Sequence, residues 1–321
     1  MNPEGKFGKL TKLISNEQCD KAKNLCVKFL NSCSDDNNRR ALQAYYKICE
    51  VKICLEKGEF DEAFQHFSGA TQLCEASTYK KNLEEILHKI YIQTRDLLRA
   101  EIDKEENEEK RRYLRERIVE WANKTAGCID HMSWRFYEIK GDEKKFSGII
   151  EKAKGNYDHA IELLDNAIKY YNEALKCKQT EKADKIIKGH IKYCEALKTE
   201  VFAQQKYLNG KIKEAADQFQ KASNLYGQCK DKRSQNWCTF LHTFLEALLM
   251  ILTPSSKEKW IEGINLLKKA LGIMPREYQE EIESLKSKIM SGGELPEDKK
   301  LMTFFDSVSV EFQKRVRSTL Y

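Results

Sequence analysis

The chain has 321 residues, of which 33% are charged and 41% hydrophobic, and its formal net charge is +6. Such a composition suits amphipathic helices with solvated outer faces. A membrane span is not expected, because the most apolar run covers residues 240–252 and a span requires about 20 apolar residues. No charged-then-apolar leader opens the chain, and its eleven cysteines, an odd number without a CxxC pair, favour reduced thiols in the cytoplasm.

Long helices are predicted over nearly the whole chain. Only four prolines occur, and none lies between Pro3 and Pro254, so helices there are free to continue. No segment alternates apolar and polar residues as a half-buried strand does. We therefore predict an all-α fold, in which Ser15 and Gln18 start the second helix as a capping box. The predicted helices cover, in chain order, residues 1–14, 15–33, 39–57, 60–76, 79–104, 108–126, 130–154, 157–177, 180–208, 212–227, 234–252, 257–273 and 276–290, with a last one from residue 297.

One pattern recurs along the chain. In residues 154–176, a glycine turn at Gly155 precedes Tyr157, Ala160, Leu164 and Ala167, and these four lie on one helix face. A glycine reverses the chain because it adopts positive φ freely, and alanines let a second helix approach closely. The self-similarity predicts a repeat protein. Further copies follow Gly58 (Phe60, Ala63, Phe67, Ala70), Gly210 (Ile212, Ala215, Phe219, Ala222) and the glycine-equivalent Glu258 (Trp260, Gly263, Leu267, Ala270), the last closed by Pro275.

This pattern resembles the second helix of a tetratricopeptide repeat. The resemblance implies a right-handed α-solenoid of antiparallel helical hairpins, with a concave surface lined by first helices. The intervals from Gly58 to Gly155, to Gly210 and to Glu258 are 97, 55 and 48 in sequence number, whereas the family's usual unit has about 34 residues. The chain therefore resembles a long-helix variant, in which the first interval spans two repeats and the mean period is about 50.

Two expectations about organisation follow from this period. Residues 79–126 should form a further hairpin that turns near Asn107, although they lack the glycine pattern. The solenoid should occupy residues 1–291, and residues 292–321 should form a C-terminal capping helix of the same domain, because a terminal repeat has an otherwise exposed face.

No catalytic motif is present. The chain lacks a phosphate-binding GxxxxGK[ST], a GxGxxG and an HExxH, so we predict that it is not an enzyme and needs no cofactor. A zinc site at His190, Cys194, Cys238 and His242 is the alternative, since these residues occupy equivalent places in successive first helices. Equivalent positions on stacked helices point the same way rather than at one ion, so we expect core residues and no bound metal.

The resemblance implies one known mode of binding. In the tetratricopeptide family, lysines, an arginine and asparagines on the first helices bind the terminal carboxylate of a peptide. Here Ile48 and Lys52 stand where a lysine and an asparagine would be expected. A carboxylate clamp of that kind is therefore not predicted.

One segment is locally basic. Residues 176–213 contain ten lysines and four acidic residues. Lys178, Lys182, Lys185 and Lys192 follow one another at intervals of four, three and seven, hence along one stripe of the predicted helix. This stripe is either a solvated face or a binding surface for an acidic peptide or helix. RNA is the alternative ligand, although only Tyr193 and Tyr207 are near to stack on bases.

We therefore predict a cytoplasmic, non-enzymatic scaffold that binds another protein at this lysine stripe, with nucleic-acid binding as the alternative and no membrane partner.

Overall fold

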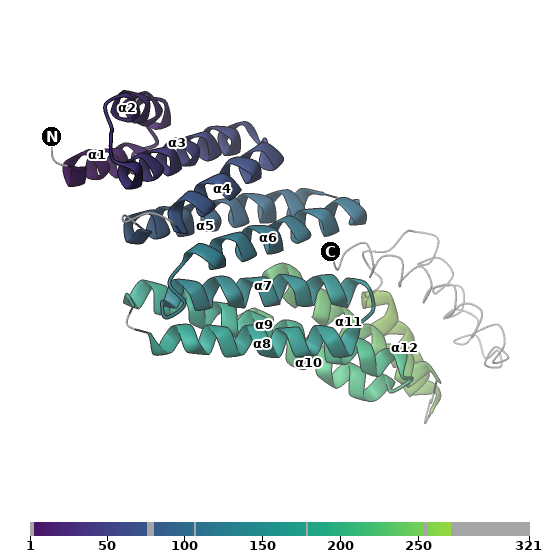
Figure 1. The fold of residues 1–321 in the computed structure, drawn as a ribbon. Coiled ribbons are helices and arrows are strands. Elements are labelled where there is room, and N and C mark those ends of the chain that lie inside the picture. Colours follow the sequence, from purple (N-terminus) through teal and green to yellow (C-terminus); the bar gives the residue numbers. More distant parts are fainter. Residues whose placement is uncertain (1–2, 76–79, 106, 178, 253–255, 271–321) are drawn as a thin grey trace. The chain divides into compact units, whose positions relative to one another are not determined.

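The computed structural model describes residues 3–75, 80–105, 107–177, 179–252 and 256–270, which form twelve α-helices and no strand (Figure 1). The prediction of an all-α fold is confirmed. The helices are α1 (Pro3–Ser15), α2 (Cys19–Asn31), α3 (Asp36–Lys57), α4 (Phe60–Glu75), α5 (Lys80–Lys104), α6 (Glu108–Cys128), α7 (Trp134–Ala153), α8 (Tyr157–Lys176), α9 (Glu181–Leu208), α10 (Ile212–Gln228), α11 (Lys232–Leu252) and α12 (Lys257–Ala270).

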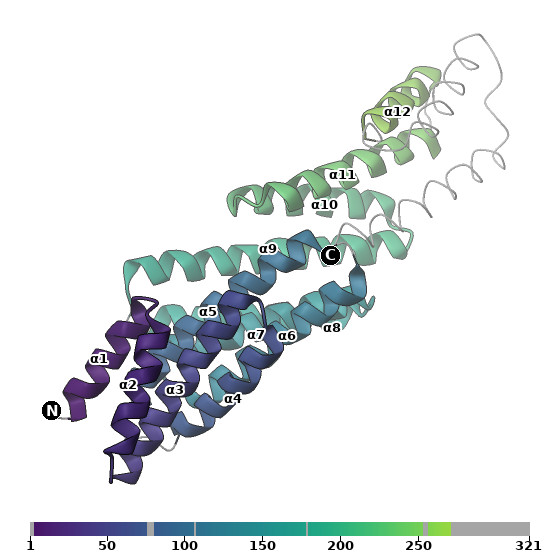
Figure 2. The same cartoon turned by 90° about the horizontal axis from the view of Figure 1, so that it is seen from above.

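The chain divides into two compact units, and the division crosses α7 and α8. The first unit holds α1 to α6 with the start of α7, up to Ser147, and the end of α8, from Lys169. The second holds the rest of these two helices and α9 to α12. Within each unit consecutive helices pack on one another, as α2, α3 and α4 do in the first and α10, α11 and α12 in the second (Figure 2).

The hairpin predicted at residues 79–126 is present. Helix α5 ends at Lys104 and α6 begins at Glu108, so no continuous helix runs through the turn. Leu98 and Leu114, each eight residues from position 106, line the same pocket, as an antiparallel pair requires. In place of a glycine turn, the buried Arg111 side chain donates to the carbonyl of Glu105.

The second helices of the hairpins therefore recur regularly. Helices α4, α6, α8, α10 and α12 begin at positions 60, 108, 157, 212 and 257. Successive starts thus differ by 48, 49, 55 and 45 in sequence number, which confirms the predicted period. The fourth copy of the pattern departs in one detail, because Glu258 lies inside α12 rather than in the preceding turn.

The three turn glycines adopt the left-handed conformation, with φ of +78° at Gly58, +82° at Gly155 and +72° at Gly210. Each glycine N–H donates to the carbonyl three residues before it, and the next N–H donates to a carbonyl five residues back at 2.9 Å. This is the Schellman motif, which satisfies the last carbonyls of a helix. The glycine turns are thus confirmed.

Two further helices end in the same motif without a glycine. Glu17 after α1 and Lys230 after α10 have φ of +59° and +61°, and the N–H groups of Gln18 and Asp231 donate five residues back. The predicted capping box is therefore wrong: Ser15 is the last residue of α1, α2 begins at Cys19, and Gln18 makes no side-chain cap. The backbone hydrogen bonds that close α1 determine this turn, and no residue type in the sequence indicates them.

Replacing Lys230 with glycine is expected to raise the free energy of unfolding by about 0.5–1 kcal/mol, because a side chain at positive φ costs about 1 kcal/mol that glycine avoids. Lys230 is exposed, so little else changes. Urea unfolding followed by circular dichroism measures the shift. The matched control is Gly210→Ala, which should lower stability by a similar amount, since no described atom lies within 4 Å of the added Cβ. A neutral Gly210→Ala would contradict the left-handed turn.

The alanines of the repeat pattern lie in the core. Ala63, Ala160 and Ala215 are fully buried, as are their partners seven residues later. At Gly263 the fit is closer still, because a Cβ there would lie 2.8 Å from the Cβ of Met250 on α11. The small residues thus allow close approach of helices, as predicted. The helix end at Pro275, the helix at 276–290 and the capping segment 292–321 lie outside the described residues.

Candidate functional site

Three of the four predicted lysines are exposed on α9. Lys182, Lys185 and Lys192 point to solvent, while Lys178 lies outside the described residues. Two other exposed residues share their face of the helix: Ile186, which is 45% exposed, and Gly189. We call these five residues the α9 surface.

The α9 surface contains no acidic residue. At 100° per residue, its five members span an arc of about 120° between Lys192 and Ile186. Glu181, Asp184 and Glu195 lie on the adjoining flank of the same helix. Glu181 lies about 20° beyond Lys192, so the arc holds three lysines, is bounded by an exposed acid on the Lys192 side and has one apolar side chain at its other edge.

Elsewhere in the basic segment the structure reduces the predicted charge excess. Lys198 pairs with Asp165 at 2.6 Å, and Lys206 pairs with Glu214 at 2.7 Å. The hydrogen bond from Lys206 also lowers the pKa of Glu214. Both acids lie outside residues 176–213, so counting charges within that window overstated the excess.

The residues considered for zinc are not brought together as a set. Cys194 and Cys238 are fully buried, and His242 Nδ1 lies 3.1 Å from the carbonyl oxygen of Ala216. All eleven cysteines are free thiols. Burial raises the pKa of Cys26 to about 12 and raises that of Cys238 further, as expected for thiols packed among apolar side chains.

Among the described residues, one group of three potential ligands does converge, and sequence reasoning missed it. Cys54, Glu59 and Glu62 place their ligand atoms within 4.8 Å of one another. Burial and the two carboxylates raise the pKa of the Cys54 thiol, which favours the protonated form. Both glutamates are exposed at the start of α4, where the helix dipole favours negative charge without any ion. We therefore assign no metal to this group.

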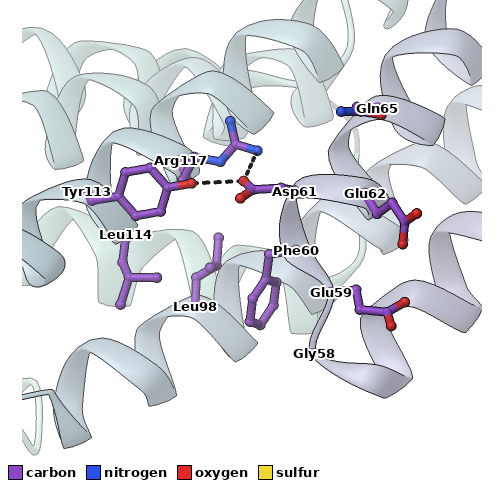
Figure 3. A pocket seen from close by; sticks show the side chains of 10 residues that line it. All are labelled: Gly58, Glu59, Phe60, Asp61, Glu62, Gln65, Leu98, Tyr113, Leu114 and Arg117. Atoms are coloured by element: carbon purple, nitrogen blue, oxygen red, sulfur yellow. Dashed lines mark hydrogen bonds and ion pairs between the residues drawn. The ribbon is translucent and has the colours of Figure 1, made fainter.

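A surface pocket of about 450 Å³ lies between α4 and α6 (Figure 3). Phe60, Leu98 and Leu114 supply apolar side chains to it. Asp61 faces Tyr113 and Arg117, whereas Glu59 and Glu62 extend away from them. Sequence reasoning did not identify this pocket, because its residues come from three helices.

Three polar side chains of this pocket interact with one another. Asp61 accepts a hydrogen bond from the Tyr113 hydroxyl at 2.8 Å, and its carboxylate lies 2.6 Å from an Arg117 nitrogen. The hydrogen bond to Asp61 raises the pKa of Tyr113. At the same repeat position, Asp158 accepts from Gln205 at 2.8 Å in a second pocket. An aspartate three residues after the turn glycine thus links one hairpin to the next, which is a structural role.

Two clusters of buried charges hold helices together. In the first unit, the carboxylate of Asp142 is fully buried. Arg95 and Lys145 donate to it at 2.6 and 2.5 Å, and the hydroxyls of Tyr91 and Tyr171 donate at 3.1 and 2.6 Å. Burial and the charge of Asp142 raise the pKa of Tyr91.

The second cluster is also built around a buried carboxylate that accepts hydrogen bonds from a cation and from a tyrosine. Glu200 on α9 is 2% exposed and accepts from Lys152 at 2.7 Å and from the Tyr226 hydroxyl at 2.6 Å. Tyr226 follows Gly210 at the same spacing as Tyr171 follows Gly155, so the repeat places the two tyrosines equivalently. Neither cluster lines the two pockets described above, and both act in helix packing.

The side chain at the expected clamp position is also structural. Lys52 is buried, and its Nζ donates to the carbonyl of Ile14 at 3.2 Å.

None of the described helices has the length and apolar content that crossing a bilayer requires. Comparison of the chain with protein-family models, with curated proteins and with solved structures found no match.

Proposed function

We propose that this protein is a non-enzymatic scaffold, built as a right-handed, tetratricopeptide-like α-solenoid, that binds an acidic segment of another protein at the α9 surface. The observation that carries the proposal is the exposed arc of Lys182, Lys185 and Lys192 without an acidic residue. Consecutive packing of hairpins at a regular interval supports the solenoid.

Protein is a better-supported ligand than nucleic acid. RNA recognition usually stacks bases on exposed aromatic rings. Tyr193 instead packs edge-on against Tyr226, with ring centroids 5.8 Å apart, and Tyr207 packs against the same core. The α9 surface offers the apolar Ile186 to a partner, which suits a protein side chain.

A binding role also agrees with the polar groups of the two pockets. Asp61 and Asp158 are each engaged by a neighbouring hairpin, as expected for side chains that hold the repeats together.

Reversing Lys182, Lys185 and Lys192 to glutamate is expected to slow association with the partner and to flatten its salt dependence, because exposed charges act mainly through long-range attraction that salt screens. Thermal stability should be nearly unchanged, since all three side chains are exposed. The partner is first captured from the native host and identified. Its association rate is then measured by stopped flow at several salt concentrations.

The matched control reverses Lys9, Lys12 and Lys21, which are also exposed and give the same change in net charge. Equal slowing by the two triple variants would show that net charge alone matters and would refute the site. Tight binding of a mixed-sequence single-stranded RNA at physiological salt, lost in the α9 variant, would establish the nucleic-acid alternative.

A further inference from the structure

Gly189 has no packing role among the described residues. It lies within the 28-residue helix α9, it is exposed, and no described atom lies within 4 Å of the place of its missing Cβ. Gly141 and Gly263 differ from it: a Cβ at Gly141 would lie 2.5 Å from the ring of Tyr171, and one at Gly263 would meet α11, whereas Gly8 in α1 is as open as Gly189. Glycine is among the least favourable residues in a helix interior, so Gly189 weakens α9 without a compensating contact there.

Gly189 lies beside an exposed apolar side chain and a lysine on the surface of α9. Ile186 lies three residues before it and Lys185 four residues before it, so both are adjacent on the helix surface. Ile186 exposes 45% of its area, although Ala183 and Ile187 beside it on the helix are buried. A gap without a side chain thus lies beside an exposed apolar residue, with lysines around both.

Such a gap admits another backbone. The distance between packed helices is set by the side chains at their contact, and a glycine removes that limit. An extended peptide gains affinity by pairing with an open sheet edge. Helix α9 offers no such edge, because its backbone N–H and C=O groups are already used by the hydrogen bonds of the helix. A helix needs only side-chain packing and a close crossing point.

We infer that the partner segment at the α9 surface is an acidic α-helix that crosses α9 at Gly189, packs an apolar side chain against Ile186 and places carboxylates near Lys182, Lys185 and Lys192. The inference rests on the proposed function and adds the partner's secondary structure. The charge complementarity selects an acidic helix over a second copy of this surface, which would bring lysines against lysines.

Two displayed peptide libraries test the inference on the full chain. One is a helix-forming scaffold with its surface positions randomised, and the other carries two prolines that prevent a helix. Peptides selected from each are titrated by fluorescence anisotropy against the wild type, the triple lysine reversal, Gly189→Gln and Gly8→Gln. Gly8 is the matched control, because it is also an exposed helical glycine with no described atom within 4 Å of its Cβ position.

The helical library should yield binders rich in Asp and Glu, and Gly189→Gln should weaken them by about tenfold or more, as expected for a central contact. Gly8→Gln should leave their affinity unchanged. Both variants should melt at or above the wild-type temperature, since glutamine favours a helix over glycine. A loss of binding then reports a blocked surface rather than an unfolded chain.

Other outcomes separate this inference from the proposed function. If the lysine reversal abolishes binding but Gly189→Gln does not, the surface binds acidic partners without a helix crossing, and the inference fails alone. Equal affinity of the proline-containing peptides would overturn it in the same way. If selected peptides tolerate both the reversal and Gly189→Gln, the inference and the proposed site fail together.

Discussion

Replacing Asp142 with alanine is expected to lower the free energy of unfolding of the first unit by about 3–5 kcal/mol. Arg95 and Lys145 are 6% and 4% exposed, and both lose their buried carboxylate in this variant. Among the described residues, Arg95 keeps only Asp96, whose side chain is 57% exposed. The substitution also removes the acceptor for the hydroxyls of Tyr91 and Tyr171. Urea unfolding followed by circular dichroism gives the size of the loss. Hydrogen exchange resolved by peptide should show it in α5 and α7, because local opening reports the affected unit.

The matched control for this prediction is Asp165→Ala. Asp165 pairs with Lys198 at the same 2.6 Å, but its side chain is 42% exposed. Exposed pairs contribute about 0–1 kcal/mol, so this variant should remain close to the wild type. Similar losses in the two variants would mean that burial does not set the strength of the Asp142 cluster.

The second large effect is expected at Glu200. Glu200→Ala should destabilise the second unit by about 3–5 kcal/mol, because Lys152 would remain buried as an unpaired cation and the Tyr226 hydroxyl would lose its acceptor. Lys152→Met should be costly for the reciprocal reason. The double variant contains neither buried charge, so it should recover part of the unfolding free energy that the single variants lose. A double-mutant cycle of unfolding free energies measures this coupling.

Lys206 and Glu214 provide the control pair. They are also a lysine and a glutamate 2.7 Å apart, but their side chains are 31% and 52% exposed. Their cycle should give a much smaller coupling, because solvent screens an exposed pair. Equal coupling in the two cycles would contradict the proposed importance of the buried pair.

The Glu200 cluster also bears on the proposed binding surface. Glu200 and Gly189 lie on the same helix, and Glu200 ties α9 to Lys152 on α7 and Tyr226 on α10. Because these bonds fix α9 in the second unit, a partner would meet a helix whose position is already determined. Pre-organisation of this kind reduces the entropy lost on binding.

Local patterns in the chain were enough to predict the twelve helices of the described residues, although not how α2 begins. Helical spacing of apolar residues, the scarcity of proline and the glycines at positions 58, 155 and 210 act within a few residues, and the structure has helices and left-handed turns at those places. The repeat period predicted the hairpin of α5 and α6 without any glycine signal. Similar reasoning applies to the lysines of α9, since helical spacing alone determines which of them share a face.

Only the tertiary structure decided where charge is neutralised and where it is buried. Asp165 and Glu214 reach lysines that a count along the sequence left unpaired, and Asp142 and Glu200 lie in the core, although nothing in their local sequence distinguishes them from exposed acids. The left-handed turns at Glu17 and Lys230 were likewise imposed by the backbone hydrogen bonds that close α1 and α10. The physical reason is common to all of these. Helix formation is local, whereas the environment of an ionisable side chain depends on which distant segments pack beside it, and burial is set by that packing.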